Sequence, residues 1–266
     1  MKPRPSPPTP RRNAARSDKK PKASADRPAI RFCIFDLDDT LYDCFGQRLR
    51  LAHRHAARAL ARAGVPASTE QIFRARMRAF RTDPRLDSID REVLRGFGVP
   101  FTKKLHQIAR QAYFGMPVQR LRLFPGARRM LRTLRRRGVR NFIVSYGEPS
   151  IQRAKVRALG LEKERAIERI FFADTAKIVT KDDLFRSLLR KMGGDASGFL
   201  VVGDRPSSEI RAGKRLGMRS ARLRHGEFAR LQPASSEEAA EFEIRRVTAV
   251  LQLPLQFGRA AAGRPS

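Results

Sequence analysis

The stretch CIFDLDDTLYD, residues 33–43, places three carboxylates directly after a short apolar run. The run FCIF predicts a buried β-strand, because short continuous apolar segments are typical of strands covered on both faces. Asp36 ends this strand and Asp38 follows two residues later, so both side chains would lie on one side if the backbone stayed extended. Crowded carboxylates are costly unless a cation meets them, and oxygen-only ligands suit Mg²⁺. An EF-hand loop starting at Asp36 is excluded, because Leu41 stands where that loop needs Gly.

The rest of the chain alternates strand-like and helix-like stretches, which predicts the fold class. The later strand-like stretches are short and apolar: NFIVSYG, RIFFAD, GFLVVGD and RSARLRHG. Helical patterns lie between them, over residues 126–137, 149–159, 182–192 and 206–216. Such alternation predicts a doubly wound, Rossmann-like α/β fold with a mainly parallel sheet. Ligands in such sheets bind beyond the carboxyl ends of the strands.

One interval interrupts this alternation. Residues 43–121 contain helical stretches and no strand signal, and a crossover between two strands is normally far shorter. We therefore expect a helical subdomain at 43–121, inserted into a core made of residues 29–42 and 122–252. Residues 1–28 lack an apolar run and hold nine basic and two acidic residues. We expect them, and residues 253–266, to form disordered tails.

A second acidic strand end occurs in the stretch VVGDRPSSE. Asp204 follows an apolar run and a Gly, and Glu209 comes in the first turn of the next helical segment. A Glu at that position also favours the helix dipole, so it has an ordinary structural explanation. Asp204, however, would lie at the same sheet edge as Asp36 and would offer a metal a carboxylate from a second strand.

Two further stretches could bind a phosphate group. Thr180 and Asp183 form a capping-box pattern that puts Lys181 in the first turn of a helix, where a cation is unfavourable unless an anion docks there. Lys177 is a competing candidate for this role. Ser145 ends another strand and Gly147 permits a tight turn, so a hydroxyl and main-chain N–H groups could meet phosphate oxygens.

The order of these parts resembles the four motifs of the haloacid dehalogenase (HAD) superfamily. The pattern consists of a strand ending Asp-x-Asp-x-Thr, a strand ending Ser-x-Gly, a Lys before a helix, and Gly-Asp-x₄-Glu. The resemblance covers about residues 30–252 and implies a Rossmann-like core with a helical cap inserted after the first strand. The chain departs from many members at Tyr146, where they have Asn, and at Glu209, where Asp is commoner. Lys181 also lacks the Pro that follows it in many relatives.

The resemblance also implies a role for each matching residue. Asp36 would be the nucleophile that forms an aspartyl-phosphate, and Asp38 would protonate the leaving oxygen and then activate water. Ser145, Tyr146, Gly147 and Lys181 would contact the phosphate. Ser145 and Lys181 would be catalytic residues that hold the phosphoryl oxygens, and Lys181 would also restrain Asp36. The Asp36 side chain, the Asp38 carbonyl and Asp204 would bind Mg²⁺, with Glu209 in the outer shell. Because an acid stands at Asp38, the resemblance favours phosphate ester hydrolysis over dehalogenation.

We therefore predict a Mg²⁺-dependent phosphatase that acts on a small phosphorylated metabolite. A phosphomutase would use the same residues, and a basic nucleic-acid-binding protein on this scaffold is the alternative from another class. The net charge of +31 makes non-specific nucleic-acid contact through the basic N-terminal tail possible, although an Arg-rich composition explains the charge equally well. Only two cysteines occur and no apolar run is long enough to cross a membrane, so we expect a cytoplasmic protein without membrane contact. Its oligomeric state cannot be read from the sequence.

Overall fold

The computed structural model describes residues 28–83, 85–173 and 179–258. Its core is one sheet of six parallel strands in the order β3-β2-β1-β4-β5-β6. The strands, in chain order, are β1 (Phe32–Phe35), β2 (Arg140–Tyr146), β3 (Ile167–Ala173), β4 (Phe199–Gly203), β5 (Arg219–Leu223) and β6 (Phe242–Ile244). This is the doubly wound, Rossmann-like order that the alternating pattern predicted.

Five of these strands coincide with the five predicted strand-like stretches, and β6 was missed. Strand β6 is three residues long, and a charged residue separates its two apolar ones. It pairs in parallel with β5 at the sheet edge, where Phe242 lies opposite Ala221. A segment this short carries no periodicity that a sequence pattern could detect.

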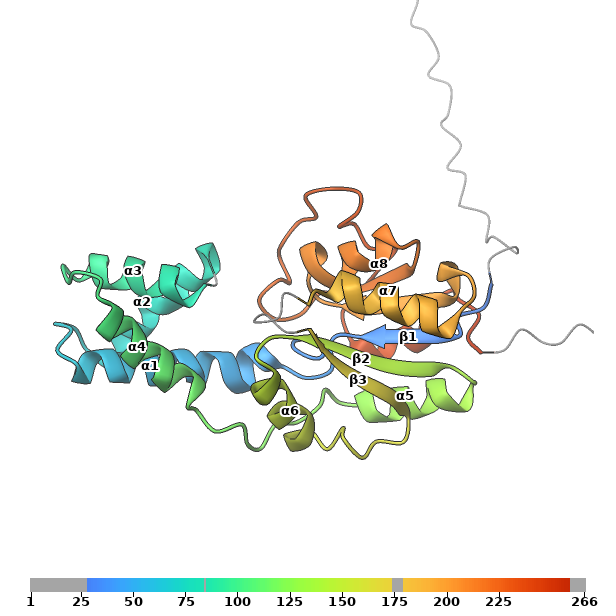
Figure 1. The fold of residues 1–266 in the computed structure, drawn as a ribbon, viewed down its shortest axis with the longest axis horizontal. Coiled ribbons are helices and arrows are strands. Elements are labelled where there is room, and N and C mark those ends of the chain that lie inside the picture. Colours follow the sequence, from blue (N-terminus) through green and yellow to red (C-terminus); the bar gives the residue numbers. More distant parts are fainter. Residues whose placement is uncertain (1–27, 84, 174–178, 259–266) are drawn as a thin grey trace, which may run out of the picture.

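Helices cover both faces of the sheet, because alternate residues of the strands point to opposite sides. Helices α5 (Ala127–Arg136) and α6 (Pro149–Ala158) pack on one face, in the apolar cluster that includes Cys33 and Phe35 of β1. Helices α7 (Lys181–Met192) and α8 (Arg211–Arg215) pack on the other, in the cluster that includes Phe32 and Ile34. Figure 1 shows these two layers on either side of β1–β3.

The interval after β1 is helical and has an apolar cluster of its own. It begins with a π-helical turn (Phe45–Leu49) and continues into four helices: α1 (Arg50–Arg62), α2 (Thr69–Thr82), α3 (Leu86–Gly96) and α4 (Lys103–Phe114). The cluster packs residues of these four helices together. Figure 1 shows the group at one end of the molecule, beyond the carboxyl end of β1. We refer to α1–α4 as the helical cap.

Two segments connect the cap to the core, and they are hydrogen-bonded to each other. Phe124 N donates to Leu41 O at 2.9 Å. The Gln47 side chain donates to Arg122 O at 2.9 Å and accepts from Arg122 N at 2.8 Å. The two connecting segments are therefore paired with each other and do not act as two independent linkers.

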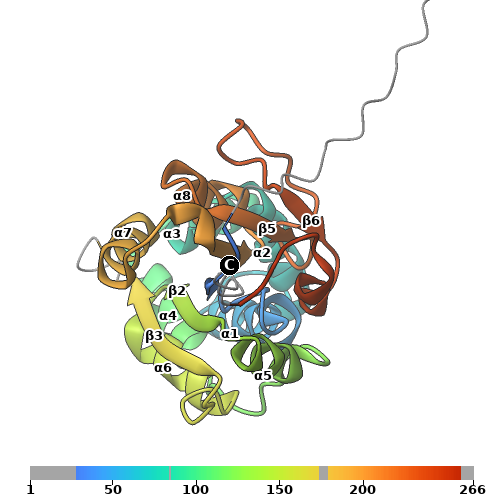
Figure 2. The same ribbon diagram turned by 90° about the vertical axis from the view of Figure 1, so that its right-hand side faces the viewer.

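The predicted tails differ in what the structure shows of them. Residues 1–27 and 259–266 lie outside the described residues. Residues 253–258, which we expected to belong to a disordered tail, are packed on the core: Ile30 N donates to Gln256 O at 2.8 Å and Gly258 N donates to Ile30 O at 2.9 Å. Leu253, Leu255 and Phe257 contact the core cluster, and their alternating apolar pattern was overlooked. Figure 2 shows this C-terminal end of the core toward the viewer. Within the described residues, no helix is both long and apolar enough to cross a membrane.

Candidate active site

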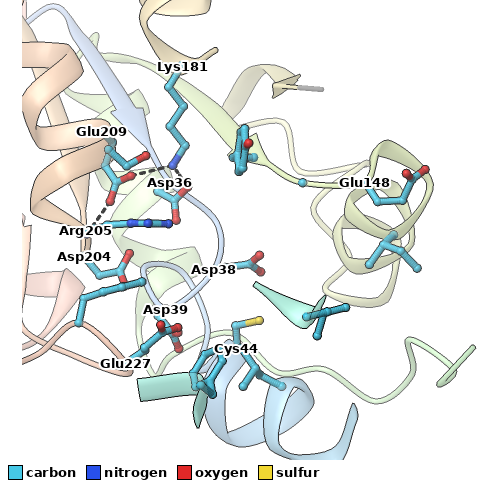
Figure 3. Close-up of a pocket in the computed structure, with 18 of the residues that line it drawn as sticks. Asp36, Asp38, Asp39, Cys44, Glu148, Lys181, Asp204, Arg205, Glu209 and Glu227 are labelled. Carbon is cyan, nitrogen blue, oxygen red and sulfur yellow. Dashed lines mark hydrogen bonds and ion pairs between the residues drawn. The ribbon is translucent and has the colours of Figure 1, made fainter. Parts of the chain in front are cut away.

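The predicted acidic residues meet at the carboxyl edge of the two central strands. Asp36 follows β1 and Asp204 follows β4, and the pairing of Phe35 with Val202 brings these two strand ends level. The strand order reverses between β1 and β4, which is where doubly wound sheets bind their ligands. A cavity of about 790 Å³ opens here, lined by both aspartates and by residues of the cap. Figure 3 shows the acidic side chains that surround it.

Lys181 lies between two of the carboxylates. Its Nζ is 2.5 Å from Asp36 Oδ1 and 2.7 Å from Glu209 Oε2, and all three side chains are buried. Thr180 and Asp183 form the predicted capping box, which starts α7 at Lys181. Burial lowers the pKa of Lys181, but the neighbouring charges of Asp36 and Glu209 outweigh it and raise the pKa overall. The raised pKa keeps Lys181 positively charged beside Asp36 at neutral pH. Its competitor Lys177 lies outside the described residues.

The carboxylates outnumber this cation. Burial raises the pKa of Asp36 to about 7, Lys181 opposes the rise, and Glu209 and Asp38 add to it. Burial and the charges of Glu209 and Asp36 raise the pKa of Asp204 well above its ordinary value. Such rises mean that the ionised carboxylates are poorly compensated by the protein alone.

The arrangement fits a bound divalent cation. Ligand oxygens of Asp36, Asp204 and Glu209 lie within 4.8 Å of one another, and all three residues are buried. Within the described part of the chain, the Asp204 carboxylate has no hydrogen-bond donor or ion-pair partner. A buried carboxylate without a partner is costly, and hard cations such as Mg²⁺ bind carboxylate oxygens. The donor set is therefore suited to Mg²⁺, with Asp204 as the available side chain.

Glu209 is already occupied by protein donors. Besides Lys181, it accepts a hydrogen bond from Arg205 N at 2.6 Å. Burial raises the pKa of Glu209, but the Lys181 charge and these hydrogen bonds outweigh it and lower the pKa. The side chain packs directly over Gly203, where a Cβ atom would collide with it. Gly203 is thus required for Glu209 to reach Lys181.

Asp38 forms its ion pair with a different lysine from Asp36. The extended backbone ends at Phe35, so the two carboxylates are not held on one side as an extended chain would hold them. Figure 3 shows them pointing in different directions. Asp38 Oδ2 is 2.6 Å from Lys155 Nζ, on α6. Burial raises the pKa of Asp38, but the Lys155 charge and three hydrogen bonds outweigh it and lower the pKa.

The predicted phosphate-binding residues at the end of β2 do not all reach the cavity. Tyr146 and Gly147 line the cavity, whereas Ser145 is not among the lining residues. Ser145 is fully buried, and its hydroxyl has no hydrogen-bond partner in the described residues. Gly147 N donates to Ala173 O at 3.2 Å, so this amide is not free. The Ser145 hydroxyl is the unused donor at this strand end.

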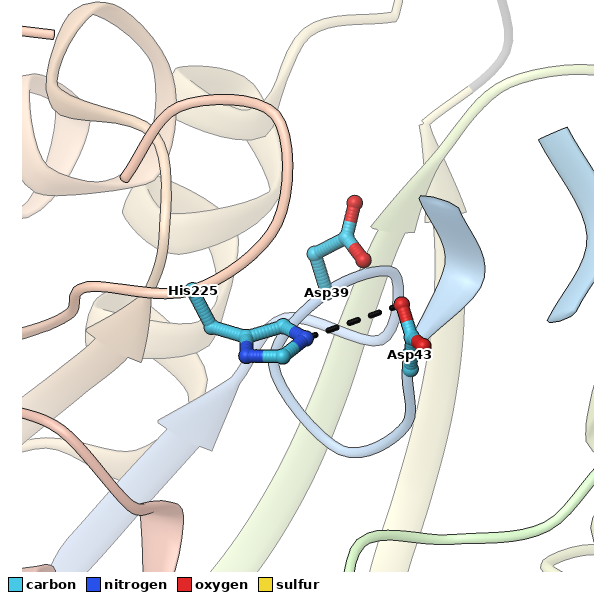
Figure 4. A group of neighbouring side chains, drawn as sticks. All are labelled: Asp39, Asp43 and His225. Atoms are coloured by element: carbon cyan, nitrogen blue, oxygen red, sulfur yellow. Dashed lines mark ion pairs between the residues drawn. The ribbon is translucent and has the colours of Figure 1, made fainter. Parts of the chain in front are cut away.

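A second acidic cluster, which contains Asp39 and Asp43, lies beside the first, and contacts within the protein explain it. Asp39 adopts a left-handed backbone conformation, φ 54°, and its Oδ1 accepts a hydrogen bond from Phe45 N at 3.0 Å. Asp43 Oδ1 is 3.6 Å from His225 Nε2 (Figure 4). Asp39 therefore fixes the turn that leads from β1 into the cap.

The residues that reach this site from elsewhere in the chain were not predicted from the sequence. Lys155 was assigned only to a helical stretch, although a lysine on the buried face of α6 was a detectable signal. The cavity is also lined by Glu227 and Phe228 of the loop after β5, and by Arg110, Tyr113 and Phe114 of α4. Nothing in the local sequence marks these five, because only the fold brings them to the strand ends.

Comparison with known families and named proteins gives consistent results. The family model for haloacid dehalogenase-like hydrolases matches residues 30–217. The glyceraldehyde 3-phosphate phosphatase of Pyrococcus abyssi (strain GE5 / Orsay) is 30% identical over 199 residues, which are 74% of this chain and 82% of that protein. The protein of the same name from Methanopyrus kandleri is 26% identical over 86% of this chain and 99% of its own.

Solved structures show the same fold at lower identity. A predicted phosphoglycolate phosphatase from Haemophilus somnus 129PT matches with a TM-score of 0.66 and 19% identity, over 84% of this chain and 97% of that one. A putative phosphatase from Clostridium difficile matches with a TM-score of 0.67 and 17% identity, over 86% of this chain and 100% of that one. At these identities the likeness concerns the fold alone.

Proposed function

The chain belongs to the haloacid dehalogenase-like hydrolases and is a phosphoric monoester hydrolase, and we propose that it is a Mg²⁺-dependent phosphatase acting through an aspartyl-phosphate. One observation carries the mechanism: the ion pair between Lys181 and the buried carboxylate of Asp36, at the wall of the cavity. A carboxylate can attack a phosphate dianion only where nearby cations reduce their repulsion.

Two steps follow from the positions of Asp36 and Asp38. In the first, an Asp36 oxygen attacks phosphorus, and the bond from phosphorus to the ester oxygen breaks with its electron pair on that oxygen. Asp38 must enter this step protonated, although Lys155 lowers its pKa, and it gives its proton to the leaving alcohol. In the second, water attacks phosphorus and gives its proton to Asp38, and the bond from phosphorus to Asp36 breaks to release phosphate. Asp38 returns to its starting protonation state, so the cycle is balanced.

Cations and donors around Asp36 would stabilise both steps. Lys181 would hold a phosphoryl oxygen and restrain Asp36, since its Nζ already bonds the nucleophile. The Ser145 hydroxyl, which lacks a partner in the described residues, would donate to another phosphoryl oxygen after a small adjustment of the β2 end. Tyr146 and Gly147 would border the phosphate from the cavity wall.

Mg²⁺ would be held by the side chains of Asp36 and Asp204 and by the Asp38 main-chain carbonyl. Glu209 would remain in the outer shell, because Lys181 and the Arg205 amide already occupy its oxygens. When bound, Mg²⁺ supplies charge neutralisation for the attack of a carboxylate on a dianion. The Asp204 carboxylate, which is buried and has no partner among the described residues, supports this assignment.

The substrate that we propose is a small phosphorylated metabolite. Glyceraldehyde 3-phosphate is the first compound to test, because relatives that carry its name match most of this chain. Helix α4 lines the cavity with Arg110, Tyr113 and Phe114, so the cap would contact the part of the substrate beyond the phosphate. Both cysteines are buried and free, which supports the prediction of a reducing compartment such as the cytosol.

Phosphate release from a panel of phosphorylated metabolites tests the proposal. The panel is assayed with Mg²⁺, with the chelator EDTA, and with the variant Asp36→Asn, which keeps the shape of the nucleophile and removes its charge. We expect release from at least one compound, and we expect it to disappear with EDTA and in the variant. Release that survives in Asp36→Asn would refute the covalent mechanism. A folded protein that releases phosphate from no compound would refute the phosphatase function.

A further inference from the structure

The carboxylate of Asp38 is held by three side chains that the proposed mechanism does not use. Lys155 Nζ donates to Asp38 Oδ2 at 2.6 Å, and Gln152 Nε2 donates to the same oxygen at 3.2 Å. Tyr42 Oη donates to Asp38 Oδ1 at 2.8 Å. Both oxygens of the carboxylate are therefore engaged, while 28% of the side chain remains exposed at the cavity.

Lys155 has no evident structural reason to be a lysine. It lies on the buried face of α6 and is 4% exposed, next to Val156 in the core cluster. Its only ion-pair partner in the described residues is Asp38, and its other near neighbour is Cys44 Sγ at 3.8 Å. Burying an ammonium group is costly, and an apolar side chain of similar length would fill the same space. The lysine is explained by what it does to Asp38.

Gln152 connects Asp38 to the end of β2. Its Nε2 also donates to Tyr146 O at 2.9 Å, and it packs against Gly147, where a Cβ would lie 2.7 Å from this nitrogen. One face of α6 thus holds both the proton-transfer group and the backbone proposed to border the phosphate. A shift of α6 would move the two together.

We propose that Lys155, assisted by Gln152, is a positioning residue that aims the Asp38 carboxylate at the ester oxygen of the substrate. The inference rests on the proposed phosphatase function and adds residues that the sequence motifs do not contain. Asp38 must transfer a proton in both steps, and such transfers lose efficiency when the group is misplaced by as little as 1 Å. Without Lys155, the carboxylate would keep the contacts from Tyr42 and, at 3.2 Å, from Gln152, and would lose the shortest of the three, at 2.6 Å.

The leaving group of the substrate distinguishes positioning from a merely structural role. An alkyl phosphate, such as glyceraldehyde 3-phosphate, releases an alcohol that needs a proton from Asp38. 2,4-Dinitrophenyl phosphate releases a phenolate that is stable without one. A variant that disturbs only Asp38 should therefore slow the first step for the alkyl ester and leave the first step for the aryl ester nearly unchanged.

The experiment measures both steps in wild type, Lys155→Met, Asp38→Asn and the control Lys163→Met, a substitution of an exposed lysine that does not line the cavity. We expect Lys155→Met to lower kcat for the alkyl ester at least tenfold with KM changed less than threefold. We expect its pre-steady-state burst of dinitrophenolate to stay within threefold of the wild-type rate. Asp38→Asn should show the same pattern more strongly, and Lys163→Met should behave as wild type.

Two results would overturn the inference. Equal losses for both esters in Lys155→Met would mean that the whole site is disturbed, and an unchanged kcat for the alkyl ester would mean that Asp38 needs no help. If Lys155→Met does not fold, Gln152→Met is measured instead, with the same pattern expected at a smaller amplitude. The proposed phosphatase function is tested separately, by whether phosphate release by the wild type depends on Asp36. If it does, that function stands even when the positioning role of Lys155 is refuted.

Discussion

Lys181 Nζ lies 2.5 Å from Asp36 Oδ1, although 145 residues separate them in the chain. The contact joins the first turn of α7 to the end of β1, and it places the positive charge of Lys181 beside the proposed nucleophile, Asp36. Everything that we propose about the chemistry depends on this pair and on the carboxylates that surround it.

Removing the Lys181 charge should abolish most of the activity. In Lys181→Met the phosphoryl oxygens lose a cation in the transition state, and we expect kcat to fall at least a hundredfold, the range known for removal of one such electrostatic contact. Steady-state kinetics on the best substrate measure the effect. Lys191→Met, at an exposed lysine at the other end of α7, is the matched control and should change kcat less than twofold. A loss below tenfold in Lys181→Met would contradict the assigned role.

Neutralising Asp204 should have opposite effects on stability and on metal binding. Burial and neighbouring carboxylates raise the pKa of Asp204 in the folded protein. The protonated side chain therefore favours folding at low pH, and this contribution to stability is lost as the pH rises and the side chain ionises. In Asp204→Asn we therefore expect a higher Tm without metal and a smaller rise of Tm on adding Mg²⁺. Thermal unfolding near neutral pH, with EDTA and with Mg²⁺, measures both. Asp87→Asn, at an exposed aspartate of α3, is the control, and an unchanged Mg²⁺-induced shift in Asp204→Asn would refute the metal assignment.

A methyl group at Gly203 should displace Glu209. The Cβ of Gly203→Ala would overlap the Glu209 side chain, which must then leave Lys181 or move the strand end. We expect a loss of about 1–3 kcal/mol in the free energy of unfolding and a large loss of activity. Gly96→Ala is the control, because no atom other than those of the adjoining backbone of α3 and its chain neighbours lies within 4 Å of the Cβ position. That change should be neutral or stabilise by up to about 1 kcal/mol. Equal behaviour of the two variants in urea unfolding would contradict the packing argument.

The two hydrogen bonds between Gln47 and Arg122 should limit movement of the cap. In Gln47→Ala both are lost, and we expect faster hydrogen exchange in the two crossing segments, residues 41–47 and 121–124. The free energy of unfolding should fall by about 1–3 kcal/mol, since each of the two hydrogen bonds contributes about 0.5–1.5 kcal/mol. Gln107→Ala, at an exposed glutamine of α4, should change neither quantity. Exchange that rises uniformly over the molecule would argue against a local hinge.

His53 should make the cap sensitive to acid. Burial, followed by the charge of Arg76, lowers its pKa to about 3 in the folded protein, against 6.5 in its unperturbed state. The unfolded chain therefore binds the proton first, and stability is lost as the pH falls below about 6.5, by up to about 1.4 kcal/mol per pH unit. Urea unfolding near pH 7 and pH 5.5 should show a smaller loss in His53→Met than in wild type. His55→Met, exposed on the same helix, should lose as much as wild type, and identical losses in all three proteins would refute the argument.

The structure shows why some residues were predictable and others were not. Asp36 and Asp204 follow apolar runs that end in a polar residue, and parallel strands of one sheet end at one edge, so their meeting followed from local patterns. Lys181 was a candidate, with Lys177 as its competitor, because a cation in the first turn of a helix opposes the helix dipole. Strand β6 was missed because it is too short to show a period. The packed segment 253–258 was missed although its alternating apolar residues were a detectable signal.

The amino-acid sequence by itself determined the alternation of strands and helices, the helical insertion after β1, and the carboxylates at two strand ends, because these depend on neighbours a few residues apart. Tertiary structure alone decided which cation each carboxylate meets. Lys181 pairs with Asp36 and Glu209, and Lys155 pairs with Asp38 across 117 positions of chain. Such pairs form only when helices on opposite faces of the sheet bring their buried sides to one edge. No pattern among neighbouring residues predicts contacts between residues so far apart in the chain.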